Sequence, residues 1–572
     1  MSSLPYHEPD IITLLTQSSF LLLLNIIDYL LNHALYCGLL GQVLLGIAFG
    51  APGGNLLSYQ AQEIIVQLGY IGLILLVYEG GLSVPLTSLK ANIGLSIGVA
   101  VTGIVVPIGL SFVLQPLLDA SPLQAFAAGA ALCSTSLGTT FTVLSTSGLT
   151  NTRLGSVLST AAMMDDVVGL VMVQVISNFG SSSNMVDPVT VVRPIVVSLG
   201  FAIVVPLLCR YVVRPVRRAL HGKTFAYKVR AIFAYRRARF VLHSIFLFGL
   251  VAAASYSGTS VLFAAYLSGA IVNWWDSEPA MAPTTSGAVS EPVVGNITGG
   301  NAVGGRAEGM AGKDVATSGI PVSSADAGID LNGLSGMSTY QSYLSQPVAR
   351  LLRPFFFASI GFSIPISDLF QGAVLWRGVV YTLLMIVGKL VCGTWLVRLL
   401  RLSGTSISGT PLFTRFRRRL AMKLLRRKSP EEKETPRPQE KSESAAQSRG
   451  SPTPIEGVES ESEPNQPSTP HEAPVSLYPG AILGCAMVSR GEIGFLISSV
   501  AESQGIWRKR GTEASGQSTE SSSDIFVIVT WAILLCTFIG PIAVGLIVRR
   551  LKRLKRAAEP GRRNVLGSWG VD

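Results

Sequence analysis

Residues 156–176 read Ser-Val-Leu-Ser-Thr-Ala-Ala-Met-Met-Asp-Asp-Val-Val-Gly-Leu-Val-Met-Val-Gln-Val-Ile, an apolar stretch that contains two adjacent carboxylates, Asp165 and Asp166. An ionised acid near the centre of a bilayer costs about 2.5–3.5 kcal/mol even on a lenient scale, and adjacent acids also repel each other. The alternative is that the pair lies at a helix end among lipid headgroups, but apolar and small residues continue beyond it on both sides. The pair therefore predicts an ion or proton site inside a membrane.

The composition favours a membrane protein. Of 572 residues, 48% are hydrophobic and 14% are charged, whereas soluble proteins are about 25% charged. Apolar stretches of roughly the 20 residues that a span requires recur along the chain. We predict an all-α multi-pass membrane protein with about thirteen transmembrane helices. They are expected at residues 11–32, 36–51, 62–84, 92–116, 122–147, 155–178, 189–213, 240–256, 258–274, 350–368, 374–400, 478–501 and 524–548.

Basic residues gather in three parts of the chain, at 210–239, 401–428 and 549–556. With this set of spans all three clusters lie on the same side, which the positive-inside rule makes cytoplasmic. The N-terminus is then outside or lumenal and the C-terminus is cytoplasmic, in the plasma membrane or an endomembrane. The net charge of +11 is thus a topology signal, and the scarcity of aromatics among the clusters argues against a nucleic-acid partner.

Two stretches interrupt the spans. Residues 276–349 are rich in Gly, Ala and Ser and are predicted to form a flexible inserted loop, in which Asn296 begins a glycosylation sequon on the cytoplasmic side. Residues 403–475 begin with basic residues and continue with Ser, Pro and Glu, a composition that stays disordered. The membrane domain then comprises residues 1–275, 350–402 and 476–550, followed by a basic cytoplasmic tail, 551–572.

Nothing in the sequence supports an enzyme, a cofactor or a resident metal. The six cysteines and five histidines are scattered without metal-ligand spacing. The glycines near residue 300 lack the strand and the Lys-Ser or Lys-Thr of a phosphate loop. An intramembrane aspartyl protease needs two acids on facing helices, whereas adjacent residues of one helix diverge by about 100°. We therefore expect a transporter with no cofactor and no metal other than the transported cation.

Four further features lie inside predicted spans. Residues 133–144 are rich in hydroxyls around one glycine, which fits ordinary helix packing or an unwound helix whose carbonyls and hydroxyls face a cation. Arg490 and Glu492 are two residues apart and share no helix face, so either the helix is broken or they lie at a hydrated end. Lys389 lies too deep to reach the interface easily, unless the span boundary is misplaced. For Glu79, an interfacial position is the favoured interpretation.

Together these residues resemble the monovalent cation/proton antiporter superfamily. Within it the sequence is most similar to the second clade, the sodium/hydrogen exchangers of double-Asp type, and to its fungal members. The likeness covers nearly all of the membrane part and neither long loop. The motifs occur in family order: 38–50, 75–82, the hydroxyl-rich span, 164–169, 355–361, Gly388-Lys389 and 490–492. The chain departs from the family at Thr135-Ser-Leu-Gly-Thr-Thr140, where relatives usually carry Pro or Asp.

The resemblance implies a fold with an inverted repeat, two crossed discontinuous helices and a homodimer. It nominates Asp166 as the main ligand for both cation and proton, and it places Asp165 in the same ion- and proton-binding set, paired with Lys389. The implied lining residues of the site are Thr135, Ser136, Thr139 and Thr140. The implied charge-compensating residues are Lys389, Arg490, Glu492 and Glu79.

The implied function is the exchange of Na⁺ or K⁺ for protons by alternating access, with the two ions and the lipid bilayer as partners. A cation channel would need a repeated filter or a ring of charges, which the sequence lacks. A cation- or proton-coupled symporter of an organic solute is the alternative class, because broken helices also serve there. The lysine and the double acid favour exchange.

Overall fold

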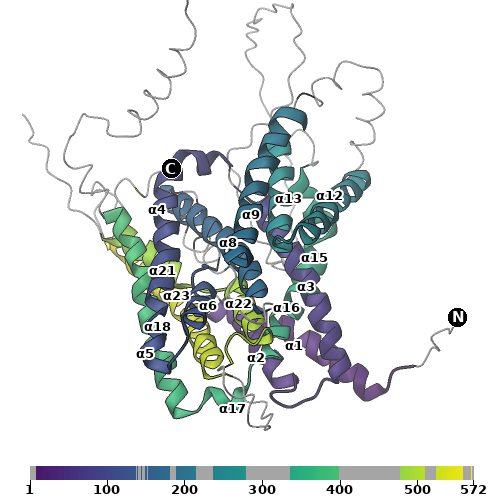
Figure 1. The fold of residues 1–572 in the computed structure, drawn as a ribbon, viewed down its shortest axis with the longest axis vertical. Coiled ribbons are helices and arrows are strands. Elements are labelled where there is room, and N and C mark those ends of the chain that lie inside the picture. The colour runs from purple at the N-terminus through teal and green to yellow at the C-terminus, as the bar shows by residue number, and fades with distance from the viewer. Residues whose placement is uncertain are drawn as a thin grey trace, which may run out of the picture. The chain divides into compact units, whose positions relative to one another are not determined.

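Helices make up almost all of the described part of the chain (Figure 1). The computed structural model describes residues 8–35, 37–84, 86–136, 138, 144, 148–150, 152–180, 188–213, 215, 236–277, 335–397, 477–508, 523–557 and 569. Contacts group residues 1–395 with 478–572 into one unit, which carries every element named below, and leave 396–477 as a second unit.

The helices of the N-terminal half are α1 (Ile11–Leu35), α2 (Gly38–Phe49), α3 (Tyr59–Leu82), α4 (Leu86–Ser111), α5 (Leu114–Leu118), α6 (Pro122–Ala131), α8 (Arg153–Gly180), α9 (Pro188–Leu208), η1 (Cys209–Val213), α12 (Arg236–Ser257) and α13 (Val261–Ser277). Those that follow are α14 (Gly336–Tyr343), α15 (Ser345–Pro347), η2 (Val348–Leu352), α16 (Arg353–Gly361), α17 (Ile366–Leu369), α18 (Gly372–Leu390), η3 (Val391–Gly393), α21 (Tyr478–Val488), α22 (Glu492–Ser503) and α23 (Asp524–Ala557).

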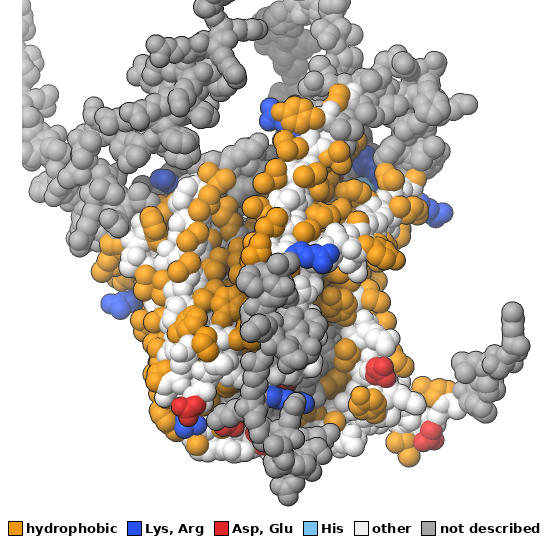
Figure 2. All heavy atoms as spheres, viewed as in Figure 1, with side chains coloured by type: hydrophobic (Ala, Val, Ile, Leu, Met, Phe, Trp, Pro, Cys, Tyr) orange, Lys and Arg blue, Asp and Glu red, His pale blue; other side chains and the backbone are white. Residues whose placement is uncertain are grey.

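Nine helical stretches in the described ranges are long and apolar enough to cross a membrane. They are Ile11–Ala34, Tyr59–Leu82, Asn92–Leu118, Arg153–Phe179, Val192–Tyr211, Arg236–Ser257, Gly372–Val397, Tyr478–Ser503 and Asp524–Leu554. On the face in Figure 2 hydrophobic side chains cover most of the described surface, and acidic side chains lie in its lower part. The expected all-α multi-pass membrane fold is confirmed, while the count of about thirteen spans stays a prediction.

The sequence-based prediction places the end of the inserted loop, at residue 349, too far along the chain. Helix α14 begins at Gly336, and α14, α15, η2 and α16 follow one another to Gly361, so the boundary at residue 349 is wrong. Residues 336–343 have few apolar side chains, which hides the helix, but Ser335 caps it by accepting a hydrogen bond from the Ser338 N–H. Gly336 N–H also donates to the Asp276 carboxylate on α13. Residues 278–334, with Asn296, and residues 398–476 lie outside the described residues.

Glycines let the helices beside the core approach one another closely. A Cβ placed on Gly81 of α3 would lie 2.1 Å from the carbonyl oxygen of Tyr266 on α13, and one on Gly269 would lie 2.2 Å from that of Tyr78. Helices α2 and α16 meet in the same way through Gly46 and Gly361. Since lipid supplies no hydrophobic force between helices, such close backbone contact is how membrane helices associate.

Candidate functional site

Two helix breaks meet at the centre of the unit. Helix α6 ends at Ala131 and the chain is non-helical at 134–136, while α21 ends at Val488 and α22 begins only at Glu492. The Ser136 N–H donates to the Ser489 carbonyl at 2.9 Å, which joins the two non-helical segments. A Cβ on Gly491 would lie 2.8 Å from the Ser136 side chain, so glycine is needed for this approach. The hydroxyl-rich segment is unwound here, and the expected discontinuous helices are confirmed.

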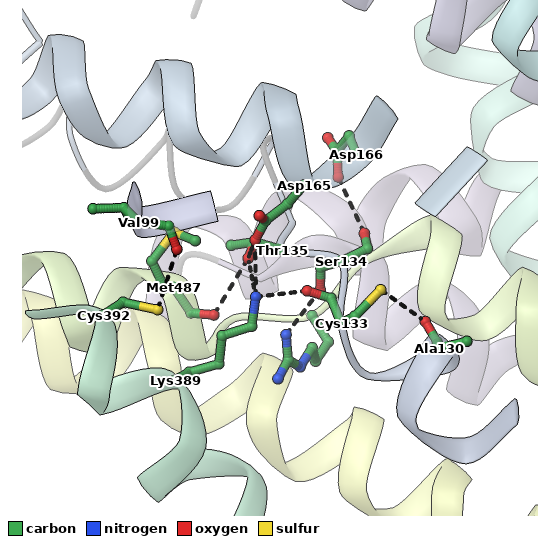
Figure 3. A network of polar contacts seen from close by, with 11 residues as sticks. Val99, Ala130, Cys133, Ser134, Thr135, Asp165, Asp166, Lys389, Cys392 and Met487 are labelled. Atoms are coloured by element: carbon green, nitrogen blue, oxygen red, sulfur yellow. Dashed lines mark hydrogen bonds and ion pairs between the residues drawn. The ribbon is translucent and has the colours of Figure 1, made fainter. Parts of the chain in front are cut away.

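A buried ion pair holds the first break against two other helices. Lys389 on α18 and Asp165 on α8 have side chains with 0% exposure, and Lys389 Nζ lies 2.8 Å from Asp165 Oδ2. The Lys389 ammonium also donates to the Cys133 carbonyl at 2.6 Å and to Thr135 Oγ1 at 3.0 Å (Figure 3). Thr135 Oγ1 in turn donates to Asp165 Oδ2 at 2.9 Å. These hydrogen bonds offset the desolvation of the pair, and Lys389 is a core residue rather than an interfacial one.

A second buried cation binds the same unwound segment. Arg490 has 0% exposure, and its Nη1 donates to the Ser134 carbonyl at 2.9 Å. Thr537 of α23 donates to the Arg490 carbonyl at 3.0 Å, which fixes the second break as well. The carbonyl oxygens at the end of a helix carry partial negative charge. Lys389 and Arg490 therefore each neutralise a carbonyl that the end of α6 leaves without a helical partner.

Asp166 faces a different environment from its neighbour, as the divergence of about 100° between adjacent helix positions requires. Its side chain is partly exposed, and Oδ1 accepts a hydrogen bond from Ser134 Oγ at 3.1 Å (Figure 3). Glu492 begins α22 directly after the second break. The geometry thus separates one acid that is buried and paired with a lysine from one that is partly exposed.

The remaining predicted site residues divide into three groups. Thr135, Ser136, Arg490 and Glu492 lie at the two breaks. Glu79 lies on α3, where it accepts a hydrogen bond from Tyr340 Oη of α14 at 3.0 Å, and no hydrogen bond or ion pair described for it reaches the breaks. Thr139 and Thr140 lie outside the described residues.

Sequence reasoning missed two residues of the site. Ser134 belongs to the hydroxyl-rich segment 133–144, where nothing in the sequence distinguishes it as the partner of Asp166. Gly103 lies in α4, where a Cβ would be 3.2 Å from Lys389 Nζ and 3.3 Å from Asp165 Oδ2. A glycine inside an apolar helix carries no signal of its own, because its importance comes from the side chains across the interface. Among the described residues no group of three or more His, Cys, Asp or Glu side chains could hold a metal ion.

The sequence has relatives among known proteins. Residues 21–290 match the family model described as the transmembrane sodium/hydrogen exchanger. The chain is 30% identical over 157 residues to the probable Na⁺/H⁺ antiporter GerT of Bacillus cereus, covering 27% of this chain and 41% of that protein. It is 32% identical over 139 residues to the high-affinity Na⁺/H⁺ antiporter NhaS3 of Synechocystis, covering 24% of this chain and 30% of that protein.

The matched parts span less than two thirds of these relatives' own length. Among solved structures, the chain is similar to the sodium proton antiporter MjNhaP1 from Methanocaldococcus jannaschii at pH 8, with a TM-score of 0.50 and 13% identity. That likeness covers 95% of this chain and 99% of that one. At this identity it shows that the two share a fold.

Proposed function

The chain belongs to the monovalent cation/proton antiporter superfamily, and on this premise we propose that it exchanges Na⁺ or K⁺ for protons by alternating access. It is then a transporter and not an enzyme. We also propose that the chain belongs to the second clade of this superfamily, which contains the double-Asp exchangers and their fungal members.

The unequal environment of the two adjacent acids is the observation that carries the proposal. Lys389 pairs with Asp165 at 2.8 Å, so Asp165 holds the broken helices in place while Asp166 is the main ligand. Asp166 keeps access and lies beside the Ser134 hydroxyl. A carboxylate with neighbouring hydroxyl and carbonyl oxygens is suited to a hard monovalent cation, and the same carboxylate can take a proton instead.

Competition for one carboxylate couples the two fluxes. A proton on Asp166 removes the charge that attracts the cation, and a bound cation excludes the proton. An empty, ionised Asp166 would be an uncompensated negative charge in a medium of low dielectric constant, so a state without either ion is unfavourable. The protein therefore changes access only with Asp166 occupied, which gives exchange rather than leak.

The remaining residues take supporting roles in this proposal. Thr135 and Ser136 line the site with Thr139 and Thr140, and Arg490 balances the helix ends with Lys389. Glu492 and Glu79 complete the set of charge-compensating residues. Two copies form a homodimer, with the N-terminus outside or lumenal and the C-terminus cytoplasmic, in the plasma membrane or an endomembrane. The basic clusters at 210–239, 401–428 and 549–556 support this orientation.

Reconstituted vesicles with an internal pH dye test the proposal. We expect a pulse of Na⁺ or K⁺, without any organic solute, to drive proton movement in the wild type. Asp166→Asn should abolish it, because an amide cannot exchange a proton for a cation. Asp119→Asn is the matched control, because Asp119 is exposed and its φ of 52° suits Asn.

Li⁺ and an organic cation, applied in turn, define selectivity. Proton movement that requires an added organic solute would favour the symporter instead. A response close to wild type in Asp166→Asn would remove Asp166 from its proposed role.

A further inference from the structure

A hollow lies away from the broken helices, between α3, α12 and α14. Its volume is about 120 Å³, and its walls are mostly apolar, with Leu75 and Tyr78 from α3, Phe240 and Leu247 from α12, and Leu344 after α14. This is roughly the volume of four water molecules in the liquid. The apolar lining disfavours water, because water needs several polar partners to remain in such a space. The size suits a short stretch of an acyl chain and excludes a whole lipid.

Helix α12 joins this hollow to a group of arginines. The α12 residues that line it are Phe240, His243, Ser244, Leu247 and Phe248, whose spacing of three and four places them on one face. The same face continues one turn toward the N-terminus of α12. There Arg236 and Arg237 lie one helical turn before Phe240, and Arg239 lies one turn before His243. Asp276 of α13 offsets part of the charge of Arg239. A net positive group therefore stands one turn from the apolar hollow.

The rest of α12 faces the surroundings with apolar side chains. Val241, Leu242 and Ile245 are 53%, 41% and 65% exposed. In a chain that spans a membrane such a surface is in contact with lipid. Lipid is thus the molecule present at high local concentration beside the hollow.

We propose that the hollow holds part of an acyl chain of an anionic phospholipid, whose phosphate the arginines at the start of α12 bind. Basic residues at a membrane boundary attract anionic headgroups, and arginine matches phosphate geometry with paired donors. A second copy of this chain is a poorer occupant, because a two-fold interface centred here would bring the same arginines against each other. The bound chain would brace α14 against α3, where Tyr340 holds Glu79.

Thermal unfolding of the purified full chain in detergent tests this inference. We expect phosphatidylinositol to raise the midpoint above that measured with phosphatidylcholine. The double variant Arg236→Gln/Arg237→Gln should lose most of this rise. The matched control Arg549→Gln/Arg550→Gln removes the same charge at the end of α23 and should keep it. Ser244→Phe, which fills the hollow, should reduce the rise while leaving the midpoint in phosphatidylcholine unchanged or higher.

The other outcomes contradict the inference. Equal losses in the two arginine variants would mean general attraction to basic surfaces. A rise produced equally by the soluble headgroup inositol phosphate would mean a phosphate site without an acyl chain. Efficient cross-linking of two copies of the variant Ser244→Cys would assign the hollow to a protein interface. Because none of these readouts measures ion exchange, the inference stands or falls independently of the proposed function.

Discussion

Inside a membrane every backbone polar group needs a hydrogen-bond partner within the protein. Two regions meet this requirement in opposite ways: the crossing of α6 with α21 and α22, and the contact of α3 with α13. At the crossing the backbone is unwound, and buried charges from Lys389 and Arg490 bind the exposed carbonyls. At the α3–α13 contact the helices stay continuous, and Gly81 and Gly269 let them meet backbone to backbone. A region that must bind an ion keeps polar groups at a cost in stability, whereas a region that serves as a scaffold removes them.

The largest effect is expected at the ion pair of the crossing. Lys389→Ala leaves Asp165 buried without a cation, and we expect it to lower the free energy of unfolding by about 3–5 kcal/mol. Adding Asp165→Asn should restore much of that stability, because the uncompensated charge is removed. A double-mutant cycle in thermal stability measures the coupling, and additive losses would show that the two residues act independently.

A smaller effect is expected at the scaffold contact. Gly269→Ala places a Cβ 2.2 Å from the Tyr78 carbonyl oxygen, so α3 and α13 must separate, at about 1–3 kcal/mol. Gly200→Ala in α9 is the control, because its Cβ meets nothing within 4 Å. Chemical unfolding compares the two. Cation selectivity in vesicles should stay unchanged in Gly269→Ala, and a changed selectivity would mean that the scaffold also shapes the site.

At Gly103 we expect the smallest change in stability, together with a change in the cation dependence of transport. A Cβ there presses on Lys389 Nζ from 3.2 Å, which a flexible lysine tip can relieve by a shift of a few tenths of an ångström. We expect Gly103→Ala to alter stability by no more than about 1 kcal/mol and to change the cation concentration for half-maximal exchange. Gly109→Ala on the same helix has open space around its Cβ and should change neither. Equal behaviour of the two variants would exclude Gly103 from the site.

The ease of prediction differed between the two regions for a physical reason. Asp165, Asp166, Lys389 and Arg490 stood out in the sequence because a charge inside an apolar span is unfavourable and requires an explanation. The break before Glu492 was one of two interpretations of two opposite charges that no continuous helix could pair. Both signals are local, so they can be found in a single sequence without comparing it with others.

Contacts that depend on the partner helix could not be predicted in this way. Gly103 and Gly269 look like any glycine in a membrane helix, and Glu79 shows no sign of its partner Tyr340. The start of α14 was missed because its cap, Ser335, lies in a segment with the composition of a loop. The different exposure of Asp165 and Asp166 follows from helix geometry, but which of them faces Lys389 came from the family likeness.

The central claim is that one accessible carboxylate binds either a cation or a proton. The most direct test is the Kd of the purified protein for Na⁺ or K⁺, measured by calorimetry over a range of pH. Competition for Asp166 predicts that the apparent Kd rises about tenfold for each unit of pH below the titration of that carboxyl, and that cation binding releases a proton. An affinity that does not change with pH, with no proton released, would contradict the account.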